Sequence, residues 1–350
     1  MTAAATPPRT TLGRTGFEIS RLGLGAWAIG GGDWQGGWGP QDDEESIRVI
    51  RHAIEGGINW IDTAAAYGLG HAEEVVGRAV GTMAPEERPL LFTKCGLVWE
   101  EGGTTVSNLL SPPSIRRECE DSLRRLGVER IDLYQLHWPT WDDTPIEDSW
   151  STMADLVGEG KVHSIGLSNF EIDDLERCEA IHPVETLQPE LNLLARGALS
   201  DRIPWARERG VGVIVYSPMA SGLLTGRFSV ERAASLPEDD WRREAPPFQR
   251  PALDRNLELV ERLGDIAASV GCELTELVIA WTLQQPGVDG AIVGARSIEQ
   301  LEGWIGAAAV QLDDEALGEI AQALAETGAG EGPTGAGDGD LLPGGRAWQA

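Results

Sequence analysis

Residues 57–77 read GINWIDTAAAYGLGHAEEVVG and combine a short apolar run with an acid and a phenol. The run 58–61 predicts a buried strand that ends at Asp62, and a loop of small residues carries Tyr67 before a helix begins near His71. In parallel α/β proteins, ligands and chemistry collect at the carboxyl ends of the strands. The pair therefore predicts a functional site. A buried acid that caps a loop beside a packed tyrosine is the alternative interpretation of these residues.

The same alternation of strand and helix continues along the chain. Eight strands are predicted, at 21–25, 58–61, 90–93, 131–136, 164–167, 185–188, 212–216 and 290–293. Helices are predicted at 43–55, 72–80, 114–126, 146–158, 172–180, 202–208, 255–270, 274–284 and from 297 onward. Strict alternation favours a parallel sheet. Eight such units fit an α/β fold of the (β/α)8 TIM-barrel type better than a doubly wound sheet.

A single catalytic domain is predicted for residues 10–326, with an arm and a tail outside it. Residues 1–9 are predicted to be a flexible arm, and 10–12 and 17–19 flank a turn that predicts an N-terminal β-hairpin. A C-terminal extra helix is predicted at 313–325, and the Gly-rich residues 327–350 predict a mobile tail. Residues 217–254 form a loop too long for a plain connection, so we expect it to be functional.

Composition narrows the class of protein. The chain has 350 residues, and its hydrophobic content of 41% argues against a disordered protein. Its net charge of −28 argues against nucleic acid or an anionic membrane as partner. Its four cysteines form no CxxC pair, which suits a reducing compartment. We find no secretory signal in the first residues and no apolar run of membrane-spanning length. The expectation is a cytoplasmic protein.

Polar residues end three successive predicted strands. Asp62, Lys94 and His137 stand at these ends, and Tyr67 lies in the loop after the first of them. Only one other lysine occurs, Lys161. A chain that uses arginine for nearly every other positive charge keeps a lysine where a titratable ammonium matters, unless biased codon usage left both lysines by accident.

These four side chains form a coherent chemical set. A phenol has a pKa of about 10, too high for easy proton donation at neutral pH. A nearby ammonium lowers that pKa because it favours the phenolate, and a carboxylate keeps the ammonium charged and in place. A histidine beside the phenol can hydrogen-bond a carbonyl oxygen. The set predicts a general acid with an electrostatic clamp for a developing alkoxide.

Two other sequence patterns do not predict a binding site. Residues 23–28 match GxGxxA, but a long Gly/Trp loop follows where a dinucleotide site needs a helix, so no Rossmann site is predicted. The remaining histidines show no metal-ligand spacing, so no metal site is predicted.

Six segments of the chain resemble the aldo-keto reductase superfamily, in its branch of bacterial stress proteins and potassium-channel β subunits. They are GINWIDTAAAYGLGHAEEVVG, LFTK, RRLGVERIDLYQLHWP, GKVHSIGLSNF, VYSPMASGLLTG and IVGARSIEQL. The resemblance implies a TIM barrel that binds a nicotinamide cofactor and reduces aldehydes and ketones by hydride transfer. It also implies that Tyr67 is the general acid, that Asp62 and Lys94 tune its pKa, and that His137 orients the carbonyl.

The resemblance further implies a set of cofactor-binding positions. Ser168, Asn169 and Gln188 would hold the carboxamide, Tyr216 would stack on the nicotinamide, Ser217, Met219, Ser221 and Leu223 would wrap the pyrophosphate, and Gly294, Arg296 and Gln300 would meet the adenosine. Arginine suits a 2′-phosphate, which favours NADPH, with NADH possible. The family's acid and asparagine at the adenine edge are replaced by Gly303 and Trp304, so either Trp304 stacks on adenine or adenine is held more loosely.

Tryptophans gather in the loops that would form the barrel mouth. Trp27, Trp34, Trp99 and Trp138 are predicted to line the substrate pocket, and Trp38 and Trp141 fall in the same loops. An aromatic-walled pocket suits flat, aromatic or sugar-like carbonyl compounds, although some of these rings can equally be packing residues.

The predicted function is reversible, NAD(P)H-dependent reduction of a small-molecule carbonyl to an alcohol. The alternative is a cofactor-binding regulatory subunit with little catalytic activity, as the channel β subunits suggest. A third hypothesis, a metal-dependent barrel hydrolase, is disfavoured by the scattered histidines.

Overall fold

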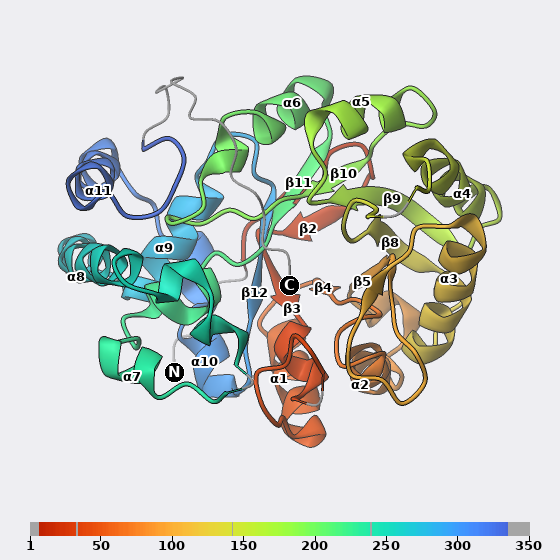
Figure 1. Cartoon of the computed structure of the whole chain (residues 1–350), viewed down its shortest axis with the longest axis horizontal. Coiled ribbons are helices and arrows are strands. Elements are labelled where there is room, and N and C mark those ends of the chain that lie inside the picture. The colour runs from red at the N-terminus through yellow and green to blue at the C-terminus, as the bar shows by residue number, and fades with distance from the viewer. Residues whose placement is uncertain (1–6, 33, 142, 239, 335–350) are drawn as a thin grey trace.

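Eight parallel strands close into a barrel, and helices surround it (Figure 1). The computed structural model describes residues 7–32, 34–141, 143–238 and 240–334. Around the barrel the strands are β3 (Leu22–Gly25), β4 (Trp60–Asp62), β5 (Leu90–Cys95), β8 (Ile131–Leu136), β9 (Val162–Ser168), β10 (Thr186–Gln188), β11 (Gly212–Val215) and β12 (Gly290–Gly294). Strand β12 pairs in parallel with β3 and closes the ring. The predicted TIM barrel is confirmed.

The helices lie outside the strands because each has one buried apolar face. In α1 (Asp43–Glu55), for example, Asp42 caps the first turn while Ile47 and Ile50 face the core. The other α-helices are α2 (His71–Val80), α3 (Pro112–Leu126), α4 (Ile146–Gly158), α5 (Ile172–Glu179), α6 (Arg202–Arg209), α7 (Val230–Ala234), α8 (Ala252–Val270), α9 (Leu274–Leu283), α10 (Ile298–Glu302) and α11 (Asp314–Thr327).

No single helix of the described residues is long and apolar enough to cross a membrane. Helices α8 and α9 reach that length and composition only as a pair, and they meet at a bend of 89°.

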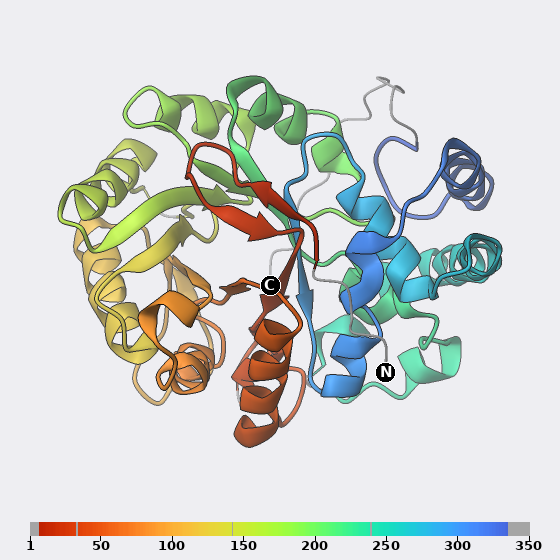
Figure 2. The same cartoon turned by 180° about the vertical axis from the view of Figure 1, so that it is seen from behind.

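The predicted hairpin closes one end of the barrel. Strands β1 (Arg9–Thr11) and β2 (Glu18–Ser20) pair antiparallel and lie across the end where the strands begin (Figure 2). Leu12 and Ile19 are fully buried there and pack with Trp60 and Phe92 inside the barrel. Gly23 makes room for this layer, since a Cβ at this position would lie 2.3 Å from the Trp60 ring. The hairpin does not cover the other end of the barrel, where the strands finish, so a functional site can lie there.

Several loops contain elements that the sequence patterns do not predict. Strands β6 (Leu97–Val98) and β7 (Ser107–Asn108) form a hairpin after β5, and the predicted loop 217–254 contains α7 and three short 3-10 helices. The helix predicted from 297 ends at Glu302. Strands of two residues and helices of about one turn are too short to show a period in the sequence.

The two ends of the chain fit the predicted boundaries only loosely. Arg9 already belongs to β1, and residues 1–6 of the predicted arm lie outside the described residues. At the other end, Arg196 donates hydrogen bonds to the carbonyl oxygens of Ala329, Gly332 and Pro333, so the start of the predicted tail is held against the barrel loops. Residues 335–350 lie outside the described part, and the division into arm, one domain and tail stays a prediction.

Candidate active site

Three neighbouring strand ends bring the predicted catalytic set together. Strands β4, β5 and β8 are adjacent in the barrel and deliver Asp62, Lys94 and His137 to its mouth. Tyr67 follows β4 on a turn, and its ring lies 5.6 Å from the His137 ring in an edge-on arrangement. All four predicted residues therefore lie in one cluster.

Lys94 is the centre of this cluster. Its ammonium is 2.5 Å from the Asp62 carboxylate, and it donates to the carbonyl oxygen of Thr63 at 2.9 Å and to the Tyr67 hydroxyl at 3.3 Å. The residue is 1% exposed. A buried charge is tolerated only when it is paired and hydrogen-bonded, and here all three ammonium protons have oxygen partners.

The surroundings shift the pKa of each member of the cluster. Burial lowers the pKa of Lys94, but Asp62 and Tyr67 raise it by more, so the amine stays charged. Burial is also the largest effect on Tyr67 and raises the pKa of its phenol, while Lys94 lowers it. The expected effect of Lys94 is present, but the net direction in this structure is upward. Tyr67 is therefore fully protonated at neutral pH.

His137 is held as a neutral imidazole. Burial, and then the charge of Lys94, bring the pKa of His137 well below its usual range. Its Nδ1 is buried and has no hydrogen-bond partner among the described residues. A neutral imidazole next to a protonated phenol can bind a carbonyl oxygen without introducing a second positive charge.

The residues expected to hold a carboxamide and a nicotinamide ring lie directly beside this cluster. Gln188 donates to Asp62 at 2.9 Å, and Ser168 donates to the backbone oxygen of Gln188 at 3.0 Å. The Tyr216 hydroxyl donates to Asn169 at 2.8 Å. These side chains place amide and hydroxyl groups next to an aromatic face at the strand ends, an arrangement that fits a nicotinamide.

The loop after β11 has an unusual backbone. Ser217, Ala220 and Ser221 have φ angles of 56°, 47° and 53°, and Gly222 follows at 92°. Non-glycine residues adopt this left-handed conformation at a cost of about 1–3 kcal/mol each, and such strain clusters at functional sites. Successive backbone N–H groups in turn conformations form concavities that bind anions, and a loop of this kind fits a pyrophosphate. Met219 lies in the same loop and Leu223 is buried beneath it.

At the expected adenosine end, Arg296 is attached to the loop before α1. Its guanidinium donates to the side chain of Gln41 at 2.8 Å and to the carbonyl oxygen of Trp38 at 3.2 Å. Gln300 accepts from the Arg296 backbone N–H at 2.9 Å, and Gly294 is exposed at the end of β12.

Trp304 does not present a face for stacking. It is 2% exposed and packs in the main hydrophobic core. The idea that Trp304 stacks on adenine is therefore wrong, because burying the large indole gains more than leaving it at the surface. A loosely held adenine edge remains the other expectation.

Four tryptophans gather around Trp27 beside Tyr67, and we call Trp27, Trp34, Trp38 and Trp241 the tryptophan cluster. Trp27 is stacked between Tyr67 and Trp241, with ring centroids 5.9 Å and 6.3 Å away. Trp34 and Trp38 lie 6.4 Å and 6.1 Å from Trp27. Arg242, paired with Asp240, lies over Trp38 at 4.9 Å. The long segment after β11 thus reaches across to the loop after β3.

The tryptophan predictions need adjustment. Trp27 and Trp34 lie beside Tyr67, whereas Trp99 lies over the Arg125 guanidinium at 5.8 Å, and half-buried Trp138 directly follows His137. Trp241 was missed. The only sequence signal for it was the length of the loop 217–254, because its partner Trp27 is distant in the chain.

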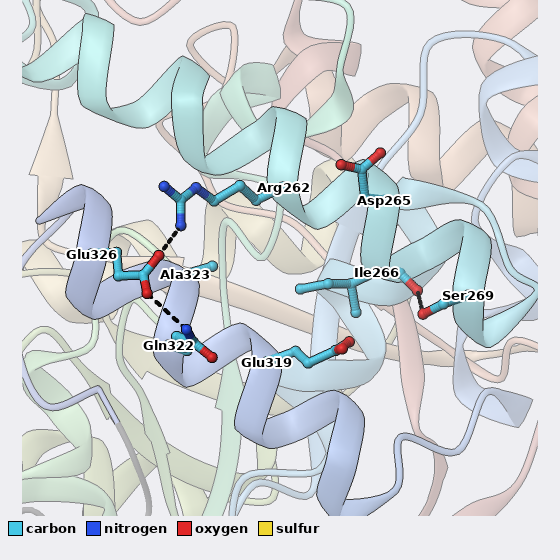
Figure 3. Close-up of a pocket in the computed structure, with 8 residues that line it drawn as sticks. All are labelled: Arg262, Asp265, Ile266, Ser269, Glu319, Gln322, Ala323 and Glu326. Atoms are coloured by element: carbon cyan, nitrogen blue, oxygen red, sulfur yellow. Dashed lines mark hydrogen bonds and ion pairs between the residues drawn. The ribbon is translucent and has the colours of Figure 1, made fainter.

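A groove on the outer surface offers no comparable chemistry. It lies between α8 and α11 and is lined by Arg262, Asp265, Ile266, Ser269, Glu319, Gln322, Ala323 and Glu326 (Figure 3). None of the predicted site residues lines it. In the described part of the chain, no three His, Cys, Asp or Glu side chains are grouped to hold a metal.

Comparisons with known proteins agree with this geometry. The sequence model described as "Aldo/keto reductase family" matches residues 21–325. The chain is 38% identical over 294 residues to "Aldo-keto reductase YhdN" of Bacillus subtilis, which covers 84% of this chain and 86% of that one. It is 34% identical over 329 residues to the "NADH-specific methylglyoxal reductase" of Escherichia coli, with 89% and 98% covered. Among solved structures, the glycerol dehydrogenase AKR11B4 from Gluconobacter oxydans superposes with a TM-score of 0.81 at 34% identity, covering 99% of this chain and all of that one.

Proposed function

The chain belongs to the aldo/keto reductase family, and from this premise we propose that it reduces small aldehydes or ketones to alcohols, reversibly, with Tyr67 as general acid. Nicotinamide-dependent carbonyl reduction is the chemistry of this family. The observation that supports the role of Tyr67 most is the chain of contacts from Asp62 through Lys94 to the phenol hydroxyl.

The roles of the four residues follow from their positions. When bound, a reduced nicotinamide supplies a hydride, two electrons and a proton, for the carbonyl carbon. Tyr67 donates the second proton to the carbonyl oxygen, which becomes the alcohol hydroxyl. Lys94, held by Asp62, stabilises the phenolate that remains until solvent returns its proton, and neutral His137 orients the oxygen. The alcohol oxidation is the same sequence in reverse.

We also propose the residues that hold the cofactor. Ser168, Asn169 and Gln188 bind the carboxamide, Tyr216 stacks on the ring, and the loop 217–223, which contains the left-handed residues, binds the pyrophosphate. Gly294, Arg296 and Gln300 meet the adenosine. NADPH is the proposed cofactor because a phosphate outcompetes neutral carbonyl oxygens for a guanidinium. The relative named as NADH-specific keeps NADH as the second candidate.

The experiment that tests the function is cofactor oxidation with a panel of small aldehydes and ketones, run separately with NADPH and NADH. Turnover that needs the carbonyl supports the reductase. Cofactor binding without turnover across the whole panel would instead favour the regulatory-subunit alternative.

Arg296 offers a prediction about cofactor choice. Arg296→Gln should weaken NADPH binding about 10- to 100-fold, because a hydrogen bond to a charged group contributes about 1.5–3 kcal/mol. NADH binding should stay unchanged. Titration of intrinsic fluorescence with each cofactor measures both, and Arg48→Gln on the exposed face of α1 is the control. Equal losses for NADPH and NADH would remove Arg296 from phosphate recognition.

A further inference from the structure

A buried ion pair lies behind the turn that carries Tyr67. The carboxylate of Glu73, in the first turn of α2, is fully buried and accepts a hydrogen bond from the Arg125 guanidinium at 2.6 Å. Its other oxygen accepts from the Thr93 hydroxyl, also at 2.6 Å. Arg125 lies in the last turn of α3, and Thr93 directly precedes Lys94 on β5. One carboxylate therefore joins three elements around the proposed catalytic residues.

The bond from Glu73 to Thr93 reaches the strand that holds the ammonium. Side chains alternate along a strand, so Thr93 and Lys94 point to opposite faces of β5. Lys94 faces the barrel mouth and meets Tyr67, whereas Thr93 faces outward and meets Glu73. Glu73 itself follows Tyr67 by six residues in the same segment. The carboxylate thus ties the strand that carries the ammonium to the segment that carries the phenol.

The turn after Tyr67 has a backbone that needs support from its neighbours. Gly68, Leu69 and Gly70 have φ angles of 60°, 57° and 99°. A non-glycine residue such as Leu69 keeps this left-handed conformation only where surrounding contacts hold it. Arg125 packs against the turn, since a Cβ added to Gly70 would lie 2.9 Å from the Arg125 Cδ. The guanidinium that Glu73 binds is therefore one of the groups that hold the turn.

The contact between the two supported segments is a long one. Lys94 Nζ lies 3.3 Å from the Tyr67 hydroxyl, whereas N–H···O bonds usually measure about 2.7–3.2 Å. Functional geometries have to be held within about 0.5 Å, so a small shift of the turn or of the strand would weaken this bond. Buried ion pairs add little net stability on average, because desolvation offsets their attraction. Position is thus a better reason than stability for the pair of Glu73 with Arg125.

We infer that Glu73 is a positioning residue of the reductase, which sets the distance between the Lys94 ammonium and the Tyr67 hydroxyl through Thr93 and Arg125. Glu73 takes no part in the proton transfer itself, because it lies behind the strand and is fully buried. This inference rests on the proposed function, since the distance matters to turnover only if Tyr67 donates the proton.

Two substitutions weaken this bridge in different ways. Glu73→Gln removes the charge that holds Arg125, and Thr93→Val removes only the hydroxyl that reaches Glu73. In both, kcat with the carbonyl that the wild-type protein reduces fastest should fall about 10-fold at unchanged NADPH affinity, since a displacement of about 1 Å can cost about 100-fold. The basic limb of the pH profile should move to higher pH, because a more distant ammonium stabilises the phenolate less. Thr93→Ser keeps the hydroxyl and should turn over at nearly the wild-type rate.

Two other glutamates are the controls. Glu74→Gln changes the exposed neighbour of Glu73 on α2 and should leave kcat, the pH profile and Tm unchanged. Glu185→Gln removes a carboxylate that accepts from the Ile165 N–H at 2.9 Å near the start of β9, so it should lower Tm without moving the pH profile. NADPH affinity and Tm show whether each variant is folded.

The outcomes separate position from stability. Folded Glu73→Gln and Thr93→Val proteins that lose only Tm, and keep the wild-type kcat and pH profile, would overturn the inference. A Thr93→Ser protein as slow as Thr93→Val, or a loss of NADPH affinity that accounts for the slower turnover, would overturn it too. If Glu73→Gln does not fold, the two Thr93 variants decide.

All these results leave the proposed function standing. Wild-type protein that binds the cofactor but turns over no carbonyl overturns the proposed function, and the inference with it.

Discussion

Lys94 makes three hydrogen bonds at the barrel mouth, and each has a separate consequence. The bond to Asp62 keeps the amine charged in a buried place, the bond to Thr63 fixes its position, and the bond to Tyr67 couples it to the phenol. Burial raises the pKa of Tyr67 and Lys94 lowers it. The ammonium therefore offsets the cost of forming a phenolate in a dry site.

Lys94→Met should reduce turnover by orders of magnitude, because it removes this compensation and leaves Asp62 buried without its partner. The phenol pKa should rise further, so the basic limb of the pH profile for reduction moves to higher pH in any residual activity. Lys161→Met, at the other lysine of the chain, is the control, since Lys161 pairs with Glu120 on the surface. A pH profile that does not move would show that Lys94 does not tune the phenol.

At the scale of elements, a buried carboxylate joins α3 to the end of β5. Glu118 is 6% exposed and accepts hydrogen bonds from the Gly96 N–H at 2.8 Å and from Ser114 at 3.0 Å. Gly96 lies two residues after Lys94, so this helix supports the strand end that carries the ammonium. Burial raises the pKa of Glu118 to about 7.

This pKa sets the direction of a pH effect on stability. The folded protein binds the Glu118 proton more tightly than the unfolded chain, so the contribution of Glu118 to stability is lost as pH rises from about 4.5 to about 7. Glu118→Gln should remove this loss, and its free energy of unfolding relative to wild type should rise by up to about 3 kcal/mol between pH 5 and pH 8. Urea unfolding across that range measures it, with exposed Glu120→Gln as control. A difference that does not vary with pH would contradict the assignment.

The elements also differ in how well the sequence predicts them. The strands and the strand-end residues were predictable, because apolar runs alternate with amphipathic helices and because Asp62, Lys94 and His137 directly follow those runs. Contacts between loops were not. Trp241 stacks on Trp27, and Arg296 donates a hydrogen bond to the loop before α1, so both contacts join segments far apart in the chain. Trp304 is buried in the core, which also depends on distant segments. No local period encodes such contacts.

In the whole molecule, the residues that close the barrel and the proposed catalytic residues lie at opposite ends. The hairpin and the layer beneath it close the end where the strands begin, and the four proposed catalytic residues lie where the strands finish. Conservative changes at the closed end should therefore alter stability while the site keeps its geometry.

Ile19→Ala tests this separation. Removing a fully buried side chain of the closed end should lower the free energy of unfolding by about 2–5 kcal/mol, whereas NADPH affinity at a temperature where the variant is folded should match wild type. Ile181→Ala, at a position 43% exposed, should change stability by less than about 0.5 kcal/mol. A large loss of cofactor affinity in folded Ile19→Ala would contradict the separation of the two ends.

The central claim is that one phenol, made able to lose its proton by Lys94, protonates the carbonyl oxygen. The most direct test is kcat for carbonyl reduction by Tyr67→Phe, with NADPH affinity measured on the same preparation. We expect kcat to fall by about 10²–10⁴-fold with cofactor affinity nearly unchanged, because the substitution removes only the hydroxyl that donates the proton. Turnover close to that of the wild-type protein would contradict the claim.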